Sequence, residues 1–111
     1  MNIPSAKQSP RIVDGVLMWY CGDTFSLSLK LNLTDQNGAK IDAVGSIECV
    51  FFDNCHNKVS EFVLTPNENT VTLDFTTDVT KRFPEGEYTY DIHYNGAHRT
   101  TIANNNKVVV E

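Results

Sequence analysis

The feature that most restricts the fold is a strict alternation of apolar and polar side chains late in the chain. Its apolar members are Tyr88, Tyr90, Ile92 and Tyr94. Successive side chains of a β-strand point to opposite faces, so this period predicts a strand with one buried face and one face in water. Asn95-Gly96 follows at once, a pair favoured in tight turns whose two central residues have positive φ. The sequence therefore predicts a long strand that folds straight back as a hairpin.

The same alternation recurs earlier in the chain. Apolar residues occupy every second position from Phe25 to Leu33, a spacing that would straddle both sides of a helix but lies on one face of a strand. Shorter patterns predict further strands at 16–20, 46–52, 58–64, 71–75, 98–102 and 107–110. Turn-forming residues separate them at 35–38, 66–69 and 104–106. The strand at 46–52 is apolar on both faces, which indicates a central strand or an outer face that meets a partner.

One segment breaks the pattern of strands. Thr77 or Asp78 could cap a single helical turn, with Val79 and Phe83 four residues apart on one side of it. Pro84 would end that turn, because the residue before a proline avoids helical angles. We expect one short helical turn at 77–83.

These elements predict an all-β fold, an immunoglobulin-like antiparallel β-sandwich of about seven strands. The connections are too short for crossover helices, so we expect largely antiparallel sheets. Residues 1–10 read as a flexible arm and 11–111 as a single domain. Tyr88, near the start of the long strand, fits a tyrosine corner. Tyr90 stands where antibody domains have cysteine, and the third strand lacks tryptophan, so the domain is not of antibody type.

Charge and hydropathy exclude several classes of function. The net charge is −5, from 14 acidic and 9 scattered basic residues, a surface that repels phosphate and argues against nucleic-acid binding. No apolar run approaches the roughly 20 residues of a membrane span, so we expect no membrane insertion. The first ten residues lack the apolar segment of a signal peptide, which predicts synthesis in the cytoplasm without export by that route.

Three cysteines, Cys21, Cys49 and Cys55, show no metal-ligand spacing. Reduced thiols are the favoured interpretation, and a bridge between Cys49 and Cys55 is the alternative.

The residues that most often carry catalysis do not assemble into a motif. Cys55-His56 could suggest a nucleophile and its base, but adjacent residues rarely present both groups to one reacting atom. His93 and His98 flank the predicted hairpin turn, yet a solvated strand face is favoured over a metal site there. The carboxylates around 74–91 lack the short regular spacing of a calcium loop. We therefore expect no metal, no cofactor and no enzymatic activity.

Two pairs of residues are candidates for a partner-contact surface. Trp19 and Tyr20 belong to residue types enriched at protein contacts, although packing in the core is favoured for this run. Val50 and Phe52 lie on the second face of their strand and are the other candidates.

Taken in order and spacing, several segments resemble a known kind of protein. They are Gly22-Asp23-Thr24-Phe25, Asp35-Gln36-Asn37-Gly38, the strand 46–53, Leu73-Asp74-Phe75-Thr76, the corner 86–92 and Thr100-Thr101-Ile102. From 16 to 110 the chain resembles the small β-sandwich proteins of phage and prophage tail modules of Gram-positive bacteria. It is similar to the N-terminal domain of phage baseplate upper proteins. Those proteins usually continue into long C-terminal regions, whereas this sequence stops at Glu111.

The resemblance implies a non-enzymatic structural component of a phage or prophage particle, a tail or baseplate accessory protein located in the virion. Its partners would be other virion proteins, reached through sheet edges and exposed apolar faces, and we expect a homo-oligomer. The alternative is an immunoglobulin-like adhesion or carbohydrate-binding module that uses Trp19, Tyr20 or the loops at one end.

Overall fold

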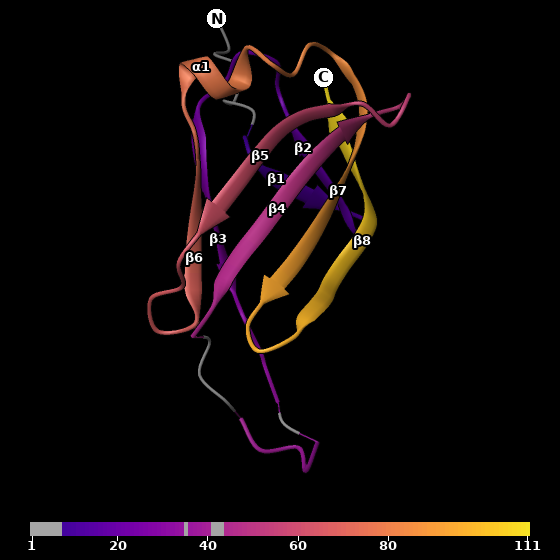
Figure 1. The fold of residues 1–111 in the computed structure, drawn as a ribbon. Coiled ribbons are helices and arrows are strands. Elements are labelled where there is room, and N and C mark those ends of the chain that lie inside the picture. Colours follow the sequence, from indigo (N-terminus) through magenta and orange to yellow (C-terminus); the bar gives the residue numbers. More distant parts are fainter. Residues whose placement is uncertain (1–7, 35, 41–43) are drawn as a thin grey trace, which may run out of the picture.

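The computed structural model describes residues 8–34, 36–40 and 44–111, which form two packed β-sheets and one short helix (Figure 1). The elements, in chain order, are β1 Arg11–Val13, β2 Val16–Trp19, β3 Phe25–Lys30, β4 Ser46–Asp53, β5 Lys58–Leu64, β6 Thr70–Phe75, α1 Thr77–Thr80, β7 Gly86–Asn95 and β8 Arg99–Val110. The predicted all-β sandwich is confirmed.

The sheets differ greatly in width. The larger sheet has the order β1-β2-β8-β7-β4-β5, and the smaller one consists of β3 and β6 alone. In Figure 1, strands β5, β4, β7 and β8 run side by side across the front. The pairs are antiparallel except for β2 and β8, which pair in parallel from Leu17↔Val108 to Trp19↔Val110. The expectation of largely antiparallel sheets is confirmed, and the parallel pair is possible because most of the chain lies between its two strands.

Trp19 lies at the centre of the core and has no exposed surface. Its ring packs against Phe25, Phe51, Phe75 and Phe83, with centroid distances of 5.2, 6.4, 5.1 and 5.3 Å. Aromatic rings in tilted and edge-to-face contact at these distances add stabilisation beyond the burial of their area. The two sheets and the segment after α1 therefore meet around one aromatic cluster.

The tyrosine corner predicted before β7 is present. The Tyr88 hydroxyl donates a hydrogen bond of 2.5 Å to the Pro84 carbonyl, four residues upstream. The Tyr88 ring also packs edge-on against Phe83, with centroids 5.2 Å apart. The corner thus fixes the path of the chain from α1 into β7, as in immunoglobulin-like sandwiches.

The hairpin predicted after the long strand is confirmed, since β7 pairs antiparallel with β8, but the predicted residues of its turn and a second predicted turn are wrong. Neither Asn95 nor Gly96 has positive φ. Instead Asn95 remains in β7, paired with Ser46 and with Arg99, and the chain reverses over residues 96–98. The turn expected at 104–106 is a bulge within β8, where Asn105 has a φ of 54° and its N–H donates to Asp91 Oδ1 at 2.8 Å. β8 is therefore one long strand rather than two short ones.

Asp14-Gly15 makes the tight hairpin turn that Asn95-Gly96 does not. Asp14 and Gly15 have φ values of 51° and 80°, and Val13 pairs with Val16 across them. Positive φ at both central residues identifies a two-residue hairpin turn of the kind that matches strand twist. β1, the other arm of this hairpin, was not predicted.

Three smaller expectations are corrected or lie outside the described residues. The expected short helix is present at Thr77–Thr80, but its N-cap is Thr76 rather than Thr77 or Asp78, and the Thr76 carbonyl accepts from the Thr80 N–H at 2.9 Å. β3 ends at Lys30, so the predicted strand was too long by the segment 31–33. Residues 1–7 of the predicted arm, and residue 35 of a predicted turn, lie outside the described residues.

Candidate partner-binding surface

The four residues predicted for partner contact have different positions. Trp19 is fully buried, so core packing, the favoured interpretation, is confirmed and Trp19 offers no contact surface. Tyr20 is half-buried, and the Arg11 guanidinium lies over its ring, 4.6 Å from the centroid. Val50 and Phe52 are half-buried on the outer face of the larger sheet. The predicted surface thus reduces to Val50 and Phe52, with Tyr20 on a separate part of the molecule.

The outer position of Val50 and Phe52 follows from the alternation along β4. Ile47, Cys49 and Phe51 are buried against the smaller sheet, so the residues between them point away from it. On the neighbouring strand β5, Val63 pairs with Glu48 and is 60% exposed. The three residues Val50, Phe52 and Val63 form what we call the outer patch.

A hydrogen-bonded polar cluster borders the outer patch. Glu48 accepts from Asn95 Nδ2 at 2.8 Å and from the Arg99 guanidinium at 2.9 Å, and Arg99 also donates to Asn95 Oδ1 at 3.0 Å. The hydrogen bonds from Asn95 and then Arg99 lower the pKa of Glu48. His93 lies opposite Glu48, and its Nδ1 is buried without a hydrogen-bond partner. Because the Arg99 guanidinium is ion-paired with the Glu48 carboxylate, the cluster adds no net charge beside the patch, and it leaves one ring nitrogen of His93 unpaired.

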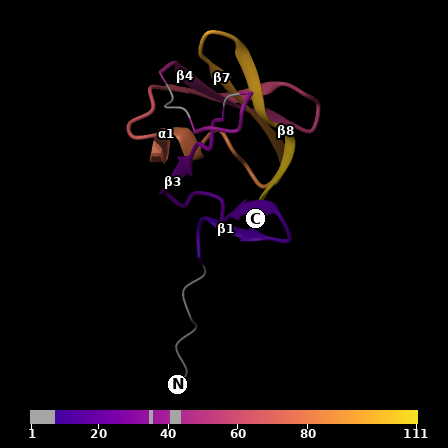
Figure 2. The ribbon, with the colours of Figure 1, turned by 90° about the horizontal axis from the view of Figure 1, so that it is seen from below.

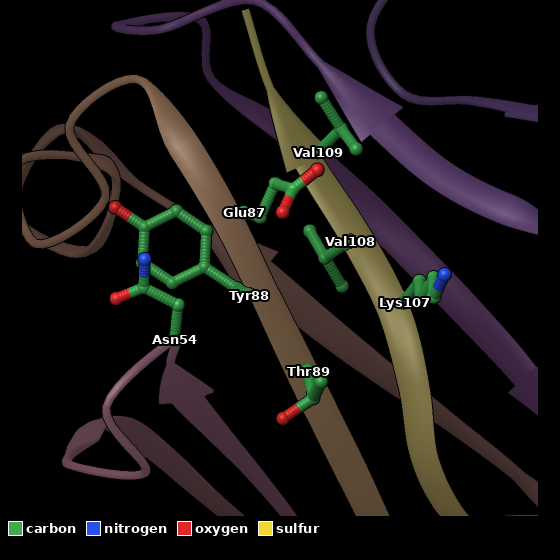
Figure 3. Close-up of a pocket in the computed structure, with 7 residues that line it drawn as sticks. All are labelled: Asn54, Glu87, Tyr88, Thr89, Lys107, Val108 and Val109. Atoms are coloured by element: carbon green, nitrogen blue, oxygen red, sulfur yellow. The ribbon is translucent and has the colours of Figure 1, made fainter.

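A small hollow lies next to the patch, on the outer side of β7 and β8 (Figure 3). Its volume is about 140 Å³, and its lining includes Asn54, Glu87, Thr89, Lys107 and Val109. In Figure 3, Asn54 lies beside the Tyr88 ring and Glu87 beside Val109. The Thr89 hydroxyl is buried without a hydrogen-bond partner. Ligand pockets usually measure about 300–1,000 Å³, so the hollow suits a side chain of a docked protein better than a small-molecule substrate.

The Cys55-His56 pair serves to form a turn. The Asp53 carboxylate accepts from the backbone N–H groups of Cys55 and Asn57, both at 2.9 Å. These bonds, with that of Asn57 first, lower the pKa of Asp53. His56 occupies a left-handed conformation with a φ of 63°. An Asx-type turn explains this polar segment without assigning chemistry to it.

The other candidate ligands are dispersed. His93 lies within β7, whereas His98 lies in the exposed turn after it. Within the described ranges, no group of three or more histidine, cysteine or acidic side chains could hold a metal ion.

The three cysteines are free thiols, which confirms the favoured interpretation over a bridge between Cys49 and Cys55. Cys49 faces the core from β4, while Cys55 is exposed in the turn that follows. Burial, with a smaller contribution from Asp91, raises the pKa of the Cys49 thiol to about 12. Cys49 is therefore protonated and unreactive at neutral pH.

Comparison with known protein families, with characterised proteins and with solved structures gives no match for this chain. Across the described residues, no helix has the length and apolar character needed to cross a membrane.

Proposed function

We propose that this protein is a non-enzymatic structural component of a phage or prophage particle, a tail or baseplate accessory protein that acts through protein–protein contacts. The observation that carries the assembly part of the proposal is the outer patch on the larger sheet. Half-buried or exposed apolar side chains framed by fixed charges are typical of protein contact surfaces, which have an apolar centre and a polar rim. The assignment to a phage particle is supported only by the order and spacing of the segments quoted above.

The net charge of the chain favours a partner that brings basic residues. Next to the patch, Glu61 is ion-paired with Lys58 and Glu48 with Arg99, so these two carboxylates add no net charge. Asp91, which pairs with Val50, adds a negative charge beside the apolar centre, and such a charge favours a basic group on the partner. The chain as a whole carries −5, so the same preference extends to longer range.

The carbohydrate-binding alternative loses its main support. Aromatic platforms bind sugars through an exposed ring face, and the Trp19 ring has none. Tyr20 has one side covered by the Arg11 guanidinium. We therefore retain the assembly function alone.

Light scattering after size-exclusion chromatography, with reductant present and over a range of concentrations, tests the proposal. We expect a discrete oligomer for the wild type and a shift toward monomer for Val50→Lys. The new ammonium group is accommodated in the monomer by Glu61 and Asp91 but would be buried in the contact. Thr72→Lys, at an exposed position of β6 in the other sheet, is the control. A wild type that is monomeric throughout, or equal behaviour of the two variants, would contradict self-assembly through the outer patch.

A further inference from the structure

The outer edge of β3 presents unpaired backbone groups. β3 pairs residue by residue with β6, and the next pair along is hydrogen-bonded, with the Leu31 N–H donating to the Asn69 carbonyl at 2.7 Å. Hydrogen-bonded pairs alternate along antiparallel strands, so the odd-numbered residues of β3 bond to β6. The N–H and C=O groups of the even-numbered residues, Ser26, Ser28 and Lys30, therefore point away from β6. Among the described residues, no strand lies on that side.

An apolar groove runs along this same edge. It has a volume of about 140 Å³, and three successive β3 residues, Leu27, Ser28 and Leu29, line it. Their side chains alternate between the two faces of the strand, so it is the backbone edge of β3 that borders the groove. Ile12, Leu17 and Ile92 of the larger sheet contribute to the opposite wall and floor. Figure 2 shows β3 close to the β1–β2 hairpin from which Ile12 and Leu17 come.

The groove is incompletely covered because the two sheets differ in width. Ile12 pairs with the buried Leu17, yet 74% of its surface is exposed. No charged side chain lines the groove. Its lining therefore selects an occupant whose inward side chains are apolar.

The size of the edge selects an extended segment rather than a folded domain. β3 has six residues, which span about 20 Å at about 3.3 Å per residue. A stable contact between folded proteins buries about 800 Å² on each partner, much more than one short strand edge offers. Strand addition instead draws its affinity from backbone hydrogen bonds and its specificity from alternate side chains in pockets.

We propose that the free edge of β3 binds an extended segment of another protein chain, which adds as a third strand to the β3–β6 sheet. Its backbone pairs with Ser26, Ser28 and Lys30. Its side chains beside Leu27 and Leu29 enter the groove and cover Ile12. The inference rests on the proposed function, because it names one contact through which a structural component would join its neighbours.

A labelled synthetic peptide of alternating valine and threonine, with a lysine at each end, is the probe. We expect saturable binding to the wild type by fluorescence anisotropy. Ser28→Pro removes the central N–H of the free edge and no bond to β6, and should weaken binding by about tenfold or more. Thr72→Pro is the matched control. Thr72 pairs with Ser28, and its own N–H points to the opposite edge of the sheet, so binding should change less than about twofold.

Hydrogen exchange of the wild type gives a second readout that does not depend on the proline variants folding. Peptide should slow exchange of the Ser26, Ser28 and Lys30 amides and leave those of Leu27 and Leu29, already bonded to β6, unchanged. No saturable binding to the wild type, equal loss in both proline variants, or protection elsewhere would each overturn the proposal. Scattering tests the outer patch and the peptide tests β3, so failure of one is distinguishable from failure of the other.

Discussion

The tyrosine corner allows a quantitative test of how the fold is held at the entrance to β7. Tyr88→Phe removes the hydroxyl that donates to the Pro84 carbonyl at 2.5 Å and keeps the ring, which is 7% exposed and packs on Phe83. A hydrogen bond of this kind contributes about 0.5–1.5 kcal/mol net. Pro84 is exposed, so water can reach its carbonyl and limits the additional cost of leaving it unpaired. We expect the free energy of unfolding to fall by about 1 kcal/mol, and the melting temperature by about 4 °C.

Tyr90→Phe is the matched control for this measurement, because it deletes the same atom from the same strand. The Tyr90 hydroxyl accepts only a 3.3 Å bond from the exposed Asn106 side chain. Its loss should change stability by less than about 0.5 kcal/mol. Urea denaturation followed by tryptophan fluorescence reports both variants through Trp19, the single tryptophan of the chain. Equal destabilisation by the two substitutions would refute the assignment of a specific stabilising role to the corner.

Two further predictions concern a buried thiol and a close backbone contact. The Cys49 pKa of about 12 in the folded protein lies above the value of about 8.5 for an unfolded thiol, so its contribution to stability is full below pH ~8.5 and is lost as pH rises toward 12. In urea titrations at increasing pH, the free energy of unfolding of Cys49→Ala should lack this part of the decline, which is about 1.4 kcal/mol per pH unit. The same decline in the variant and the wild type would contradict the burial of the thiol. A Cβ added at Gly45 would lie 1.9 Å from the Asn95 carbonyl oxygen, so Gly45→Ala should cost more than about 2 kcal/mol. Calorimetry should show no comparable loss for Val44→Ala at the neighbouring, 86% exposed position, and a stable Gly45→Ala would contradict the close approach.

Strands whose own pattern of apolar and polar residues shows which side chains are buried could be predicted well. The predicted strand 58–64 matches β5, and the predicted 46–52 differs from β4 by one residue at its end. Apolar residues on both faces of 46–52 correctly indicated a strand with neighbours on each side, since β4 lies between β7 and β5. The local sequence pattern was sufficient for these two strands because it shows which side chains become buried on folding.

Features that depend on distant partners could not be predicted in the same way. Asn95 favours a tight turn by its own preference, but its side chain bonds to Glu48 and its backbone pairs with Ser46, which holds it in β7. The parallel pairing of β2 with β8 has no local pattern either, because it joins segments from opposite ends of the sequence.

The same distinction, between local pattern and distant partners, applies to the two candidate surfaces. Val50 and Phe52 were found because a second apolar face on one strand is visible in the sequence. The free edge of β3 was not, since the residues of β3 alternate in the same way whether one or two strands pair with it. The free edge could have been inferred only from the division of the strands between the two sheets. A sandwich with six strands in one sheet and two in the other leaves part of the inner face of the larger sheet uncovered.

The position of β8 between β2 and β7 has a consequence for synthesis on the ribosome. β2 is translated long before β8, the strand that pairs with it on the side away from β1 and ends at Val110. The Trp19 carbonyl likewise accepts from the Glu111 N–H at 2.9 Å. A nascent chain therefore holds its N-terminal hairpin and Trp19 without their partners until β8 has left the exit tunnel. The larger sheet can therefore be completed only after β8 has been synthesised, and until then the aromatic segment of β2 is a natural binding site for chaperones.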